Sequence, residues 1–327
     1  MSEKLTRRDF LRKSATWGAI AWGLGEYGLP ASAAPAGRAK VVLVKDPRVL
    51  RGGKIDPSVV EEMLRRGILA LSGAKSVEEA WRSFFRPKDV VGLKLNCLFG
   101  PGASTHPEVT MAVVKGVQLA GVKPENILLW DRSDGDLRKS GYRLNRAGPG
   151  VQCYGTGGDY EPEVTRHRSF HGRLSKILTR KITALINVPI LKDHRIAGIT
   201  AAMKNHYGSF NNPNEHHDNN CDPYIADLNS LPVIQEKTRL IVCDALQPIP
   251  EGGPRFSPRF RWDYAGLLLS TDPVALDYCG WRIIEERRRE VGLRPLKQVG
   301  RPPRQLASAA KLGLGTNDPH RIELVQI

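Results

Sequence analysis

Residues 182–222 carry the densest group of side chains that could do chemistry in this sequence. An apolar run, 184–191, ends at Lys192-Asp193-His194, and a run of small residues, 197–203, leads into Lys204-Asn205-His206. A loop with few hydrophobic residues follows as far as Asp222. Four of the eight histidines of the chain fall in this stretch. A surface loop does not require them, so the stretch is the first candidate for a site.

Imidazole, carboxylate and thiolate groups in this stretch suit a divalent metal. Together they favour zinc, iron, manganese or nickel over copper(I), which prefers sulfur ligands. A lone histidine is more often a satisfied structural residue, and a paired histidine in a loop is often solvated. The cofactor is unknown from sequence, and a divalent metal is suspected. The candidate metal ligands are His194, His206, His216, Cys221 and Asp222.

Two lysines flank the same histidine-rich segment. A lysine can hold an anionic group, and a desolvated lysine can act as a base or as a nucleophile. The sequence therefore predicts Lys192, His194 and Lys204 as catalytic residues.

A second candidate lies where strand 90–95 runs through Asn96 into a loop with Gly100 and Gly102. Thr105 and Glu108 have the spacing of a capping box, which predicts a helix over 106–120. Backbone N–H groups at such a helix start can face an anion, although an ordinary helix start fits equally well. The predicted cofactor-binding residues are Asn96, Thr105, His106, Asp131 and Asn205.

These side chains must be positioned by alternating strands and helices. Alternation of this kind predicts an α/β fold in one large domain, with a mostly parallel, mixed sheet and helices on both faces. Ligands bind at the carboxyl ends of the strands in such sheets. We expect polar residues at five strand ends to converge there. They are Asn96, Asp131, the run Lys192-Asp193-His194, Asp244 and Asp272. Asp131 and Asp244 could instead shape loops, and Asp272 with Pro273 could simply begin a helix.

Residues 1–33 form a predicted twin-arginine signal peptide, with Arg7-Arg8 ahead of an apolar stretch and Ala31-Ser32-Ala33 as a cleavage site. The pattern predicts export by the twin-arginine translocase to the periplasm or the exterior. The apolar stretch falls short of the ~20 residues that span a bilayer, so no integral membrane segment is expected after cleavage. The α/β domain is expected over 38–327.

Charge and cysteine spacing limit the partners. The formal net charge of +15 favours anionic partners, among them a small anionic ligand. Nucleic acid is not expected, because no basic and aromatic residues interleave. The five cysteines include no Cys-x-x-Cys pair, so no ferredoxin-type iron–sulfur motif is present. One or two disulfides remain open.

Several segments together resemble the family catalogued as domain of unknown function 362. They span about Lys40 to Glu286 and are Val91-Gly92-Leu93-Lys94-Leu95-Asn96, Ser104 to Val109, Ile127 to Arg132, Asn187 to His194, Met203-Lys204-Asn205, Cys221-Asp222-Pro223 and Ser270 to Asp277. The resemblance implies little about activity. Some members carry ferredoxin-like cysteine motifs, which this chain lacks. The Ser-Thr-His-Pro helix start also has a layout similar to that of nickel-cofactor racemases, which is an analogy only.

The sequence thus predicts an exported enzyme of redox or isomerase type that uses a metal or anionic cofactor at the carboxyl edge of its sheet. The alternative is a carrier that binds a metal or cofactor without turnover and serves another exported complex. Binding of nucleic acid through the positive charge ranks below both.

Overall fold

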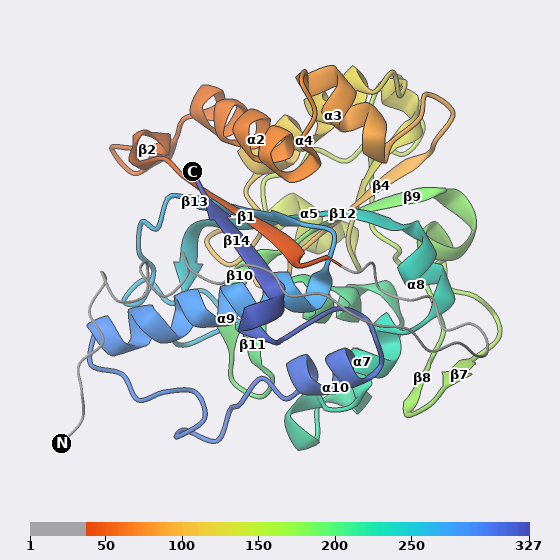
Figure 1. The fold of residues 1–327 in the computed structure, drawn as a ribbon. Helices are drawn as coiled ribbons and strands as arrows, with labels where there is room; N and C mark the ends of the chain where they lie inside the picture. The colour runs from red at the N-terminus through yellow and green to blue at the C-terminus, as the bar shows by residue number, and fades with distance from the viewer. Residues whose placement is uncertain (1–36) are drawn as a thin grey trace, which may run out of the picture. The chain divides into compact units, whose positions relative to one another are not determined.

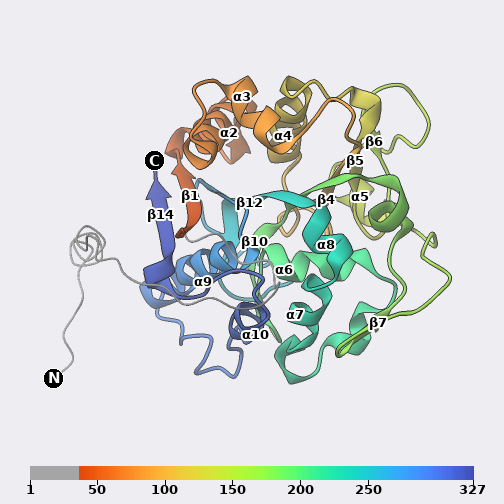
Figure 2. The same cartoon turned by 45° about the vertical axis from the view of Figure 1, so that its right-hand side comes forward.

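A mixed ten-stranded sheet organises the protein in this computed structural model, which describes residues 37–327 (Figures 1 and 2). The predicted signal peptide lies outside the described residues. The main path runs β14 (Ile322–Gln326), β1 (Ala39–Lys45), β13 (Gly266–Ser270), β12 (Thr238–Ile249), β9 (Ala184–Val188), β4 (Val91–Leu95), β5 (Ile127–Trp130) and β6 (Gln152–Cys153). β10 (Ile190–His194) pairs with β12 and with β11 (Gly198–Thr200).

Most neighbouring strands in this sheet are parallel. β14 is parallel to β1, and β12, β9, β4, β5 and β6 are parallel to one another. β13 runs antiparallel to both of its neighbours, β1 and β12. The mostly parallel, mixed sheet predicted from the sequence is confirmed, and Gly37–Ile327 forms one unit.

Helices cover both faces of the sheet. The long helices are α2 (Pro57–Ser72), α3 (Val77–Phe84), α4 (Pro107–Leu119) and α9 (Pro273–Glu290), and the short ones are α5 (Asp134–Lys139), α6 (Ala202–Asn205), α7 (Tyr224–Asn229), α8 (Pro232–Lys237) and α10 (Gln305–Lys311). Figure 1 shows α2, α3 and α4 on one side and α9, α7 and α10 on the other. Alternate residues of β1 follow this division, with Val42 and Val44 in one core cluster and Val41 and Leu43 in another. Two short hairpins complete the fold, β2 (Leu50–Arg51) with β3 (Lys54–Ile55) and β7 (Thr165–His167) with β8 (Phe170–Gly172).

Local sequence accounts for the ends of the long helices. Asp56 accepts a hydrogen bond from Ser58 N at the start of α2, and Gly73 ends that helix with a left-handed φ of 72°. Asp272 accepts from Val274 N and Ala275 N at the start of α9. Aspartate caps and a closing glycine are local signals, so these helix boundaries follow from the sequence nearby.

The expected strand over 184–191 is interrupted at Pro189. Proline has no N–H to donate to a ladder, so β9 stops at Val188. The chain then shifts sideways, and β10 pairs with the far part of β12, with Ile190 opposite Asp244 and Lys192 opposite Ile249. β12 has 12 residues, because this second partner lengthens its ladder.

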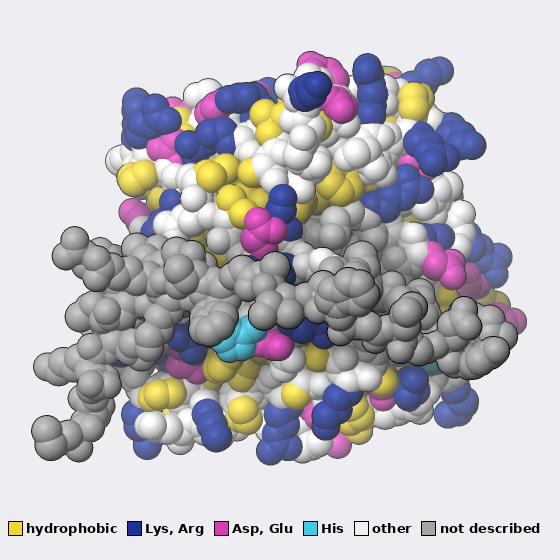
Figure 3. Space-filling model, in the orientation of Figure 1, with side chains coloured by type: hydrophobic (Ala, Val, Ile, Leu, Met, Phe, Trp, Pro, Cys, Tyr) yellow, Lys and Arg dark blue, Asp and Glu magenta, His cyan; other side chains and the backbone are white. Residues whose placement is uncertain are grey.

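Basic side chains are spread across the visible face of the molecule, mixed with acidic and neutral ones (Figure 3). Within residues 37–327, no helix is long and apolar enough to cross a membrane.

Candidate functional site

The carboxyl ends of β4 and β5, together with β10 and the middle of β12, bring most of the predicted polar residues to one region. Asn96 follows β4 and Asp131 follows β5, while Asp244 lies beside the end of β9 and donates its N–H to Pro189 O at 2.8 Å. Asp272 does not belong to this group. It follows β13, which is antiparallel to β12. Asp272 therefore lies beside the amino ends of the parallel strands, where it caps α9. The expected convergence of five strand ends is therefore corrected to four.

A buried ion pair lies at the centre of this edge. Lys94 Nζ is 2.7 Å from Asp131 Oδ1, and the two side chains are 1% and 7% exposed. Asp131 Oδ2 also accepts the backbone N–H of Cys97 at 2.6 Å. Gly208 lies over the pair, since a Cβ at that position would be 2.6 Å from both Asp131 Oδ1 and Lys94 Nζ. The segment around Gly208 therefore shields the pair from water.

Amide side chains extend this pair into a network. Asn205 Nδ2 donates to Lys94 O at 3.0 Å and to Asn187 Oδ1 at 2.8 Å, and Asn205 Oδ1 accepts from Asn96 Nδ2 at 3.0 Å. Asn96 Oδ1 accepts in turn from Lys192 Nζ at 2.9 Å. The structure thus joins three predicted cofactor-binding residues, Asn96, Asp131 and Asn205, to the predicted catalytic Lys192.

Lys192 is almost fully buried, with 1% of its surface exposed. Besides Asn96 Oδ1, its ammonium group donates to the carbonyl oxygen of Ala103. Burial lowers the pKa of Lys192 to about 7, although the charges of Asp131 and Asp193 oppose the change. The neutral amine is therefore much more accessible near neutral pH than it is for a lysine in water.

Lys204 forms a second, separate contact group with aromatic partners. Its Nζ lies 3.2 Å from His217 Nε2 and 3.2 Å from the centre of the Tyr207 ring. Burial lowers the pKa of Lys204 to about 7. His217 Nδ1 donates to Pro213 O at 2.8 Å, which leaves Nε2 as the acceptor that faces the lysine.

His194 packs against His217 and is affected by the charges of both lysines. It stacks on His217 with ring centres 5.6 Å apart, and its Nδ1 accepts the N–H groups of Ile196 at 3.2 Å and Ala197 at 3.1 Å. The proton of the neutral ring is therefore on Nε2. Burial, followed by the charges of Lys204, His217 and Lys192, lowers the pKa of His194 well below its usual value. His194 is thus a neutral ring whose Nε2–H is its donor.

The start of α4 differs from the prediction. His106, not Thr105, is the N-cap residue, and no side chain caps the helix. Thr105 Oγ1 instead donates to Val188 O at 2.7 Å, which ties the loop to the end of β9. The backbone N–H of Thr105 bonds to Asn96 O at 2.9 Å and that of His106 to Asp244 Oδ2 at 2.8 Å. The capping box is therefore wrong, and these two N–H groups already have protein acceptors.

His106 and Asp244 form a dyad that the sequence did not pair. His106 Nδ1 is 2.7 Å from Asp244 Oδ2, and Asp244 is fully buried. Burial opposes the charged imidazole, but the charge and hydrogen bond of Asp244 raise the pKa of His106 above its usual value. A carboxylate that holds Nδ1 leaves Nε2 available for proton transfer.

The five predicted metal ligands lie apart. His206 is buried beside Ser209 and Asn187, whereas His216 packs among aromatic rings, including Phe170 and Tyr224. Within residues 37–327, no group of three or more His, Cys, Asp and Glu side chains is arranged to hold a metal ion. The five residues therefore do not form one ligand set, because their own packing partners separate them. All five cysteines are buried and unpaired.

Residues 91–282 match the sequence profile of the family described as domain of unknown function (DUF362). The chain belongs to this family. Lys94, Asn96, His106, Asp131, Lys192, Lys204 and Asp244 all fall within the matched residues of this family member. No match was found among curated proteins.

Two solved structures show a weak likeness to this family member. One is a protein from Thermotoga maritima solved by a structural genomics consortium, at 11% identity and a TM-score of 0.40, with 75% of this chain and 61% of that chain covered. The other is the lactate racemase apoprotein from Thermoanaerobacterium thermosaccharolyticum, at 13% identity and a TM-score of 0.42, with 78% and 59% covered. This chain thus spans about three fifths of the length of each.

Sequence reasoning missed Lys94 and the role of His217. Lys94 lies inside the buried strand β4, and a lysine within an apolar run is a signal in itself, because an unpaired charge there would be costly. The prediction named His216 as a metal ligand and gave its neighbour His217 no role. Only the fold shows that His217 faces Lys204 while His216 faces the aromatic cluster.

Proposed function

We propose that this protein is an exported enzyme that binds a small anionic substrate at the carboxyl edge of its sheet and transfers protons there, as an isomerase or a related oxidoreductase does. One observation carries the proposal. Lys192 and Lys204 are both buried, the charges of both act on His194, and no carboxylate of residues 37–327 accepts a hydrogen bond from either lysine.

A buried lysine without a carboxylate partner is costly in its charged form. A buried lysine can avoid this cost by losing its proton, and the pKa of both lysines is accordingly lowered to about 7. It can also avoid the cost by binding an anion. An arriving carboxylate or phosphate would restore the charged form. The pair therefore supports the capture of an anionic group.

Each residue has a distinct role in this proposal. Lys192 holds the anionic group, since Asn96 fixes its position. Lys204, whose pKa burial lowers to about 7, accepts a proton from the substrate. His106, whose Nδ1 is hydrogen-bonded to Asp244, serves as the second acid or base for the substrate. Export by the twin-arginine route rests on the leader sequence alone.

Proton uptake on binding tests the anion site. Titration calorimetry at pH 8 with a panel of small carboxylates, in two buffers of different ionisation enthalpy, should show that binding takes up protons. Lys192→Met should abolish this uptake. Lys176→Met is the matched control, because Lys176 is a surface lysine paired with Asp159.

Turnover is tested separately by exchange. Incubation with the bound carboxylate in deuterium oxide should place deuterium on carbon in the wild type and not in Lys204→Met. Binding without exchange would favour the carrier instead of the enzyme. An absence of binding across the panel would contradict the proposed site.

A further inference from the structure

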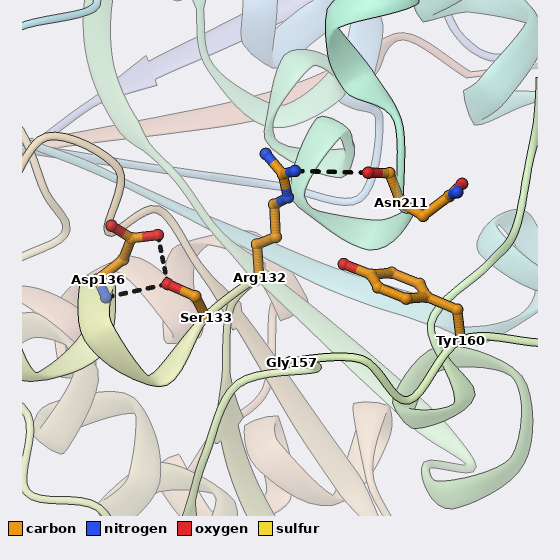
Figure 4. A pocket seen from close by; sticks show the side chains of 6 residues that line it. All are labelled: Arg132, Ser133, Asp136, Gly157, Tyr160 and Asn211. Carbon is orange, nitrogen blue, oxygen red and sulfur yellow. Dashed lines mark hydrogen bonds between the residues drawn. The ribbon is translucent and has the colours of Figure 1, made fainter.

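A separate pocket lies on the outer side of the end of β5 (Figure 4). Asp131 turns inward to Lys94, and the next residue, Arg132, lines a cavity of about 470 Å³. This volume is in the range of small-molecule sites. The other lining residues are Ser133, Asp136, Gly157, Tyr160 and Asn211.

Arg132 presents a cation to this pocket with little compensation. Its guanidinium group donates a long hydrogen bond to Asn211 O at 3.4 Å and interacts with the Tyr160 hydroxyl, and it forms no ion pair with any carboxylate of residues 37–327. A guanidinium group has five N–H donors in a planar fork that matches a carboxylate. Most of that donor capacity is left for a ligand.

Tyr160 adds a hydroxyl beside the guanidinium group. Figure 4 shows its oxygen directed toward Arg132. Burial raises the pKa of Tyr160, so the phenol stays protonated and can donate a hydrogen bond. Arg132 and Tyr160 together form a donor surface for a carboxylate.

Asp136 gives the same pocket a negative group. Its Oδ2 accepts the hydroxyl of Ser133 at 2.6 Å, and within residues 37–327 no ion pair neutralises its charge. A site for a simple anion would not place a carboxylate in its wall, because like charges repel. A ligand with both charges would satisfy both residues.

The geometry points to this pocket as a binding site for a small zwitterion, an amino acid or another amino carboxylate, with its carboxylate on Arg132 and Tyr160 and its ammonium group on Asp136. The inference is independent of the proposed function. The two lysines of the Lys192 site donate to no carboxylate of residues 37–327, so that site favours anions over zwitterions.

The test uses the mature protein and amino carboxylates of increasing length, namely glycine, β-alanine, γ-aminobutyrate and ε-aminocaproate, in titration calorimetry at pH 7. At least one should bind, and more tightly than butyrate or butylamine, which each carry one of the two charges. Arg132→Gln should weaken that binding about tenfold or more, as expected for losing hydrogen bonds to a charged group. Arg138→Gln is the matched control, since Arg138 is exposed on α5 outside the pocket.

A second variant checks the ammonium contact. Asp136→Asn should bring the affinity for the amino carboxylate that binds most tightly down to that for the carboxylate of the same length without the amino group, while Lys192→Met should leave binding unchanged. No binding by any member of the series would overturn the inference. So would equal losses in Arg132→Gln and Arg138→Gln, or a loss in Lys192→Met alone.

Discussion

Replacement of Asp131 by asparagine should be among the most destabilising single changes at the edge of the sheet. Both carboxylate oxygens are in use, Oδ1 with Lys94 Nζ and Oδ2 with Cys97 N. An amide has only one acceptor oxygen, so one of these two donors would face an NH₂ group. Lys94, 1% exposed, would also lose its counter-charge. Breaking a buried pair by removing one partner costs about 3–5 kcal/mol.

Urea unfolding measures this loss. The unfolding midpoint of Asp131→Asn, followed by circular dichroism and by tryptophan fluorescence, should fall well below that of the wild type. The control is Glu61→Gln, which breaks the exposed pair with Lys115 and should cost about 0–1 kcal/mol. The double variant Lys94→Met/Asp131→Leu should recover part of the loss, because no charge is left unpaired.

The reasoning would be refuted if Asp131→Asn lost no more stability than Glu61→Gln. Lys94 would then be neutral or hydrated in the folded protein, and the ion pair would not hold the edge together.

Three further predictions follow from single contacts. The pKa of Lys204 is about 7 in the folded protein, against a usual value of 10.5. Between these two pH values the unfolded state binds more protons than the folded state, so the stability of the folded protein rises with pH. Lys204→Met should therefore flatten the rise in melting temperature from pH 7 to pH 9. Gly116→Ala would place a Cβ 2.1 Å from the buried ring of Trp81, so it should lower the free energy of unfolding, measured in urea, by about 1–3 kcal/mol. The control is Gly135→Ala, whose Cβ would be 3.9 Å from its nearest neighbour and which should be neutral or stabilising. Asp272→Ala removes the cap of α9 and should cost about 1–2 kcal/mol by the same measurement, and no loss would mean that the cap is redundant.

Local sequence determined the long elements of this protein. Helices α2 and α9 carry an aspartate cap followed by proline, and strands β4 and β9 are short buried runs, so periodicity and capping were enough to place them. The alternation of these elements also fixed the fold class, because parallel strands require a crossover between them. The short helix α5 was missed, since six mostly polar residues carry little periodic signal.

The direction of a strand and the partner of a side chain were decided only by the tertiary structure. Asp272 and Asp244 both look like strand-end carboxylates in sequence, yet the antiparallel β13 sends Asp272 to the far edge, while Asp244 meets His106, 138 residues away. The polar residues at the strand ends could be listed from sequence. Their pairing could not, because it depends on strand order and register, which long-range contacts set. The Lys94–Asp131 pair, the dyad of His106 and the pocket of Arg132 all arise from those contacts.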